Sequence, residues 1–214
     1  MSDDRRIILE QLDASLGLLP ERTPYPEFAA DAATPDRLTG NGPVLFAERL
    51  MKANTAVVET PQSLGDFLAE RKARIGYCDP DLAPLLQPWL AADVELDLEF
   101  DRGRVNEYAF GITRATSGVI ETGSLILTDR DTSNRLGALA PWIHIACLDP
   151  GALHLTLADA ITGLGDDPNV VFVTGHSQTA DVEGILIQGV HGPGEQVCLL
   201  YDLALPEGPG DPDQ

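Results

Sequence analysis

The chain has 214 residues, of which 43% are hydrophobic and 22% are charged, and its formal net charge at pH 7 is -20. This length and composition are typical of one globular domain with a sizeable core. Basic residues cluster only at Arg5-Arg6 and at Arg71-Lys72-Arg74, which argues against DNA or RNA as a partner. No apolar run approaches the ~20 residues of a membrane span, and the N-terminus lacks a secretory signal, so we expect a cytoplasmic protein.

The predicted elements begin with an amphipathic helix over residues 5–19, followed by an irregular arm rich in Pro and Gly over residues 20–43. The pattern then becomes regular and predicts a helix over 44–53 and a strand over 56–59. We therefore predict three parts of the chain: an N-terminal helix and arm (1–43), an α/β domain (44–205) and a disordered tail rich in Pro, Gly and Asp (206–214).

A strand, a Thr or Asp followed by Pro, and a helix recur in this order along the chain. The capping pairs are Thr60-Pro61, Asp79-Pro80 and Asp149-Pro150, and the third helix is predicted to run through Ile161. The side chain of the Thr or Asp accepts a free N–H of the first turn, and Pro is favoured at the first helical position. Repeated βα units predict an α/β fold with a largely parallel sheet flanked by helices.

The remaining regular segments are less uniform in pattern. Residues 111–123 are ambiguous between helix and loop, and residues 129–141 form a polar connection. Further strands are predicted at 74–78, 94–100, 124–128, 142–148, 170–173 and 197–201.

The three cysteines, Cys78, Cys147 and Cys198, lie far apart and beside apolar runs. An odd and scattered set argues against a disulfide framework, and an iron–sulfur cluster usually needs four closely spaced thiolates. We expect three buried thiols and no cluster cofactor within this chain.

A first polar cluster, Ile120-Glu121-Thr122-Gly123-Ser124, precedes the apolar strand at 124–128. A carboxylate held at a glycine turn can act as a base, a nucleophile or a ligand anchor. Alternatively, Glu121 is solvated or caps a helix. These residue types alone leave both interpretations open.

A second polar segment follows the apolar run 170–173, which ends in Thr174-Gly175. We expect this run to be a buried strand that delivers the segment to the sheet edge where open α/β proteins bind ligands. Free N–H groups and hydroxyls there can hold an anion, while the alternative is helix capping with surface acids, and a helix is possible over 182–190. The side chains concerned are those of Ser177, Thr179, Asp181 and Glu183.

Two histidines, His176 and His191, lie in loops that we expect to reach the same sheet edge, and Gly192 follows the second. No two histidines have the close spacing of a metal site, so we predict none. His144 alternates with apolar neighbours in a predicted strand, which favours a position in the core.

Two stretches resemble the LUD-domain family, and the match covers about residues 106–203. Residues 112–127 include IETGSLIL, which is similar to the family's I-A-E-T-G-T-L. The stretch TGHSQTADVEGILIQGVHGPGEQVCLLYD resembles its G-P-S-x-T-A-D-I-E … G-V-H-G-P. In its size and its lack of cysteine motifs, the chain resembles the LutC/YkgG members of the family rather than their larger iron–sulfur relative. Gly175-His176-Ser177 departs from the family, which has Gly-Pro-Ser there.

The resemblance implies a layered α/β fold like that of the NagB/RpiA/CoA-transferase group. It also implies that the chain is the cluster-free component of an L-lactate utilisation system, which oxidises lactate to pyruvate together with iron–sulfur partner proteins. It places a candidate catalytic residue at Glu121 and candidate ligand-binding residues at Thr122, Gly123, Gly175, Ser177, Thr179, Asp181, Glu183, His191 and Gly192.

Two other functions stay open. The first is a stand-alone small-molecule binding protein or enzyme for an acyl-CoA, a phosphosugar or a folate. In that case Glu121 takes the place of the CoA-transferase nucleophile by fold analogy. The second is an interaction module that uses the arm at 20–43 and the acidic surface.

Overall fold

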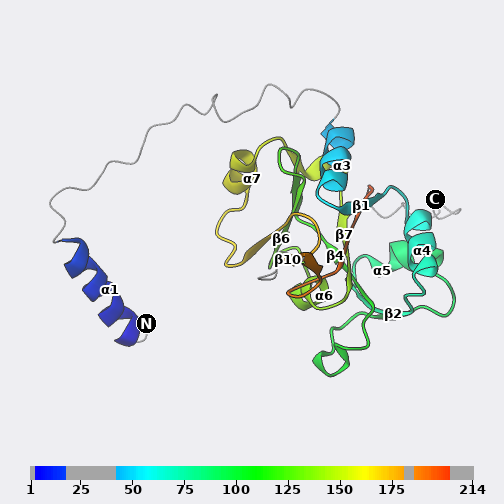
Figure 1. The fold of residues 1–214 in the computed structure, drawn as a ribbon, viewed down its shortest axis with the longest axis horizontal. Helices are drawn as coiled ribbons and strands as arrows, with labels where there is room; N and C mark the ends of the chain where they lie inside the picture. Colours follow the sequence, from blue (N-terminus) through cyan, green and yellow to red (C-terminus); the bar gives the residue numbers. More distant parts are fainter. Residues whose placement is uncertain (1–2, 18–41, 181–185, 203–214) are drawn as a thin grey trace, which may run out of the picture. The chain divides into compact units, whose positions relative to one another are not determined.

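A computed structural model describes residues 3–17, 42–180 and 186–202 (Figure 1). The predicted N-terminal helix is confirmed as α1 (Asp3–Leu16), which belongs to a separate unit and is exposed over residues 4–16. Residues 20–41 of the predicted arm and the predicted tail lie outside the described residues, so the proposed division of the chain stays a prediction. In the described ranges, no helix has the length and apolar character to cross a membrane.

The centre of the second unit is a six-stranded sheet whose neighbouring strands are all parallel. The prediction of an α/β fold with a largely parallel sheet flanked by helices is therefore confirmed. In spatial order the strands are β1 (Thr55–Val58), β12 (Glu195–Leu200), β7 (Ile143–Leu148), β4 (Phe110–Arg114), β2 (Ile75–Cys78) and β3 (Glu95–Asp97).

The two faces of this sheet bury different clusters of apolar side chains. One face packs against α4 (Pro61–Glu70) and α5 (Ala83–Leu86), which η1 (Gln87–Trp89) follows. The other face packs against α3 (Gly42–Lys52) and α6 (Arg135–Leu139). Strand β7 alternates between the two clusters, because successive side chains of a strand point to opposite faces.

A second sheet of four strands adds a further layer beyond the face that α3 covers. Its strand β6 is antiparallel to both β5 and β9. Leu125 and Leu127 of β6 share a core cluster with α3, while Ile126 packs on the opposite side against α7 (Leu157–Gly163). The spatial order is β8 (Leu153–His154), β5 (Ser117–Val119), β6 (Ser124–Thr128) and β9 (Val170–Val173).

The helix-start signals predicted from sequence are only partly confirmed. Thr60 caps α4 through a capping box with Pro61 at the first position, as predicted. The helix predicted from Asp149-Pro150 through Ile161 is wrong. The Asp149 side chain closes only a 3-10 turn, η3 (Pro150–Ala152), and β8 then pairs with β5 before Thr156 caps α7.

A further helix start differs from its prediction, and a segment that the sequence left ambiguous has a regular structure. Asp79 closes a turn by accepting the N–H of Asp81 at 3.0 Å, and α5 begins only at Ala83 and has four residues. Residues 111–123, ambiguous in sequence, belong largely to β4 and β5. Gly111 lies against the backbone carbonyl of Gly137 in α6, where a Cβ would not fit.

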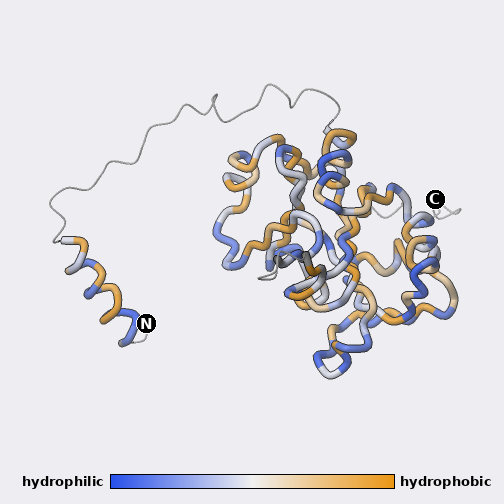
Figure 2. The backbone as a smooth tube through the Cα atoms, in the orientation of Figure 1, coloured by the Kyte–Doolittle hydropathy of each residue, from blue (hydrophilic) through white to orange (hydrophobic). Residues whose placement is uncertain are grey.

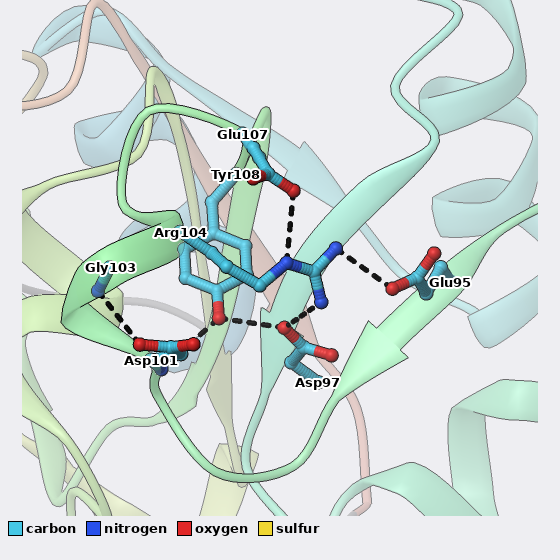
Figure 3. A network of polar contacts seen from close by, with 7 residues as sticks. All are labelled: Glu95, Asp97, Asp101, Gly103, Arg104, Glu107 and Tyr108. Carbon is cyan, nitrogen blue, oxygen red and sulfur yellow. Dashed lines mark hydrogen bonds and ion pairs between the residues drawn. The ribbon is translucent and has the colours of Figure 1, made fainter.

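The excursion between β3 and β4 is hydrophilic (Figure 2) and is held by one guanidinium. Arg104, at the end of η2 (Arg102–Arg104), donates to Asp97 at 2.7 Å and to Glu95 and Glu107 at 2.9 Å each (Figure 3). Hydrogen bonds to Glu107 and Glu95 raise the pKa of Arg104 above its ordinary value. This network fixes the excursion to the edge strand β3.

The three cysteines are free and buried, as predicted. Burial raises the pKa of the Cys78 and Cys198 thiols to about 12 and the pKa of Cys147 well above its ordinary value. The thiolate is the form that reacts and ligates metals, so burial keeps all three in the unreactive form.

His144 lies in the core, also as predicted, and is 1% exposed. Its Nε2 pairs with the Thr113 hydroxyl at 2.9 Å and its Nδ1 with Gln196 Oε1 at 2.9 Å. Burial lowers the pKa of His144 to about 4, because the imidazolium would lose its hydration. The neutral ring therefore links strands β4, β7 and β12.

This depressed pKa predicts a loss of stability in acid. Below the unfolded-state pKa of about 6.5 the unfolded chain takes up a proton that the folded chain excludes until pH 4. At pH 5 the cost is about 2 kcal/mol of unfolding free energy. We expect urea unfolding to show this fall between pH 7 and pH 5 in the natural chain and a smaller fall in His144→Gln. Equal falls in both proteins would contradict the assignment.

Candidate functional site

Two glycines of the predicted site lie against the carboxyl-terminal end of α3. Gly123, in the turn between β5 and β6, has a φ of 65°, and a Cβ there would lie 2.7 Å from the Arg49 carbonyl oxygen. Gly175, after β9, has a φ of 79° and lies directly against the carbonyl of Ala53. Both positions therefore need glycine for backbone conformation and for close approach.

Three hydroxyls form a chain beside these glycines. Ser124 Oγ lies 2.7 Å from Thr122 Oγ1 and 2.6 Å from Thr174 Oγ1. Ser124 is buried, whereas the two threonines are exposed. The antiparallel pairing of β6 with β9 brings them together, because β6 begins where β9 ends.

These hydroxyls form one side of a cavity of about 370 Å³ between α7 and the four-stranded sheet. The rest of its lining is apolar and comes from the side chains of α7 and β9. The lining residues are Thr122, Ser124, Leu157, Ile161, Phe172 and Thr174.

Glu121 precedes this group and caps a helix. Its Oε2 accepts the backbone N–H of Leu157, the first residue of α7, at 3.1 Å. A carboxylate is stabilised there by the helix dipole and by the free N–H group. This arrangement is the capping alternative left open by the sequence, and a catalytic role for Glu121 stays a prediction.

A second group of predicted residues gathers around Ser177. Its backbone N–H donates to the Pro193 carbonyl at 2.9 Å, its carbonyl accepts from Gly189 at 3.0 Å and its Oγ accepts the N–H of His191 at 3.3 Å. Gly192 lies beside the same side chain. The structure thus brings Ser177, His191 and Gly192 together.

Thr179 lies in a two-stranded antiparallel ribbon of β10 (Gln178–Ala180) and β11 (Leu186–Gln188) and pairs with Ile187. Asp181, Glu183 and most of the helix considered over 182–190 lie outside the described residues. The described parts of that range form β11 and a turn rather than a helix.

His176, which replaces the family's Pro, is tied to its own loop. Its Nδ1 lies 3.3 Å from the Ser177 carbonyl, and its Nε2 lies 3.2 Å from Nε2 of Gln178. Both contacts of the ring are therefore with residues that directly follow it in the same loop. Over the described residues, no group of three His, Cys, Asp or Glu side chains is placed to hold a metal ion.

The location of the site differs from the sequence expectation. The run 170–173 does not belong to the parallel sheet but is β9 at the edge of the four-stranded sheet. It is half-buried rather than buried, and Phe172 is exposed. Residue type and spacing do not identify Thr174, Phe172, Leu157 and Ile161 as lining residues, because only the tertiary pairing of β6 with β9 and the packing of α7 bring them together.

Comparison with known proteins identifies the family. The LUD domain model matches residues 80–201, more than half of the chain. The chain belongs to the LUD-domain family. The family resemblance inferred from the IETGSLIL and TGHSQTADVEG stretches is therefore confirmed.

Individual relatives match over shorter ranges. An uncharacterized protein of Neisseria meningitidis serogroup B is 31% identical over 94 residues, which cover 42% of this chain and 40% of that protein. Lactate utilization protein C of Bacillus pumilus is 26% identical over 102 residues, covering 44% of this chain and 42% of that protein. The matched part of the chain thus spans about two fifths of these relatives' length.

A solved structure of a DUF162 family protein from Deinococcus radiodurans has the same fold. It superposes with a TM-score of 0.52 at 21% identity, covering 74% of this chain and 94% of that chain. This likeness supports the layered α/β architecture described above.

The glycine contacts with α3 can be tested against a matched glycine. Gly165 has a φ of 62°, close to that of Gly123, but a Cβ there would meet nothing within 4 Å. We expect Gly165→Ala to lower the unfolding free energy by about 1 kcal/mol, the cost of the left-handed conformation. Gly123→Ala should cost about 2 kcal/mol more, because the Arg49 backbone must shift. Urea unfolding measures both, and equal losses would show that the close approach adds nothing.

Proposed function

We propose that this protein is the cluster-free component of an L-lactate utilisation system and acts in the cytoplasm. Iron–sulfur partner proteins carry the electrons released when lactate is oxidised to pyruvate. The observation that carries the proposal is the LUD domain match over residues 80–201, together with relatives named Lactate utilization protein C.

The chemistry of the cysteines supports this division of labour. The chain has three cysteines, fewer than the four thiolates of a typical cluster site. Each is buried, and burial raises the pKa of each thiol. These thiols are poorly suited to hold an iron–sulfur cluster, which supports placing the clusters of the proposed system on partner proteins.

Deletion of the gene from the host is expected to abolish growth on L-lactate and to leave growth on glucose unchanged. Co-purification from lactate-grown cells should bring down partners whose visible spectrum shows iron–sulfur absorption. Complementation with the natural chain is the control. Undiminished growth of the deletion strain on lactate would refute the proposal.

A chemical role of the Glu121 carboxylate can be separated from helix capping by a substitution that replaces one of its oxygens with nitrogen. Glu121→Gln keeps an oxygen that accepts the Leu157 N–H but removes the nucleophile, whereas Glu121→Ala removes both. We expect Glu121→Gln to restore growth of the deletion strain on lactate. We expect Glu121→Ala to lower the unfolding free energy by about 1 kcal/mol through loss of the cap. A folded Glu121→Gln protein that fails to restore growth would instead assign the carboxylate a chemical role.

A further inference from the structure

Three exposed apolar side chains line the cavity beside α7. Leu157, Ile161 and Phe172 are 36%, 54% and 42% exposed, and all three line the same cavity. Its volume of about 370 Å³ lies within the range of small-molecule sites. An apolar wall with a few polar groups opposite is the usual composition of a small-molecule site.

The hydroxyl chain leaves one proton unused. Thr122, Ser124 and Thr174 supply three O–H donors, but the two contacts between them consume only two. Whichever way the chain is oriented, one hydroxyl retains a proton that neither contact uses. When Ser124 donates to one threonine, that threonine keeps its own proton, and both threonines are exposed, so either can present it to an acceptor in the cavity.

The electrostatics of the cavity disfavour an anion. Among the described residues that line it, none carries a charge. The N–H of the lining residue Leu157, at the start of α7, could attract an anion but already donates to the carboxylate of Glu121. The whole chain has a net charge of -20. A carboxylate ligand buried here would lack the cation that desolvation demands.

We propose that this cavity binds an uncharged carbonyl compound with an apolar ring or chain. The carbonyl oxygen accepts the spare hydroxyl proton at Thr122 or Thr174, and the apolar part packs on Leu157, Ile161 and Phe172. The inference goes beyond the proposed function, because lactate and pyruvate are carboxylates at neutral pH and do not fit this chemistry.

The hydroxyl side of the cavity is also rigid. Gly123 lies between Thr122 and Ser124, Gly175 follows Thr174, and both glycines pack against the end of α3. A site whose polar groups are held in place before binding loses less entropy when a ligand arrives.

Two probes of similar size, one neutral and one anionic, test the proposal. 2-Acetonaphthone is a neutral ketone, and 2-naphthoate carries a carboxylate on the same ring system. NMR titration of the methyl signals of Leu157 and Ile161 reports binding at the cavity itself. We expect the ketone to shift these signals, and naphthoate to bind at least about tenfold more weakly, because its charge must be desolvated without a partner.

Variants then separate the hydroxyls from the apolar wall. Thr122→Val/Thr174→Val keeps the shape of both exposed side chains and should weaken ketone binding about tenfold, the worth of one hydrogen bond. Val190→Ala removes an exposed apolar group outside the lining and should change nothing. Absence of ketone-induced shifts at Leu157 and Ile161, equal binding of the two probes, or full affinity in the double valine variant would overturn the proposal. Because the assay uses the purified chain without lactate, its outcome is independent of the growth experiment.

Discussion

The carboxyl-terminal end of α3 is the contact on which the arrangement of the second unit depends. Backbone carbonyls of Arg49 and Ala53 lie against Gly123 and Gly175, which belong to turns far apart in the sequence. Upstream in the same helix, Phe46 and Leu50 pack between the two sheets. One helix thus sets both the spacing of the layers and the position of the turns, and any side chain at either glycine would force them apart.

The two sequence motifs of the LUD family lie in two separate parts of this fold. The Glu121–Ser124 stretch provides a helix cap, a close glycine contact and part of a hydroxyl chain. The second motif forms the junction in which Ser177 joins His191 and the backbone of Pro193. Thr174 and Gly175 link the two, since one completes the hydroxyl chain and the other leads into the junction. Much of each motif therefore stabilises the fold, and only a few exposed groups remain available to contact a ligand.

Local signals in the sequence predicted those parts of the fold that depend on nearby residues. Thr60-Pro61 marks α4 correctly, because a capping box needs only neighbours within one turn. Asp149-Pro150 failed, because the pairing of Leu153 with Gly118 takes the following residues into a sheet. The true start of α7 has the same chemistry at Thr156 and Asp159. Tertiary contacts decide between such competing local signals.

The candidate site shows the same limit of sequence reasoning. Glu121, Thr122 and Ser177 were found by residue type and by family resemblance. The apolar wall was not, since Leu157, Ile161 and Phe172 resemble ordinary core positions until the packing leaves them exposed. Likewise, β9 has the composition of a central parallel strand. It lies at an edge because, in the four-stranded sheet as described, it pairs with β6 on one side alone.

The position of β12 has a consequence for how the protein is made. This strand lies between β1 and β7, and β1 has no other neighbour in the six-stranded sheet as described. During translation, β1 emerges early but has no partner there until residues 195–200 have been synthesised. One edge of β7 therefore stays unpaired from the synthesis of residues 143–148 until residues 195–200 follow. Such late, long-range closure slows folding, and an unpaired strand edge favours aggregation until it is covered.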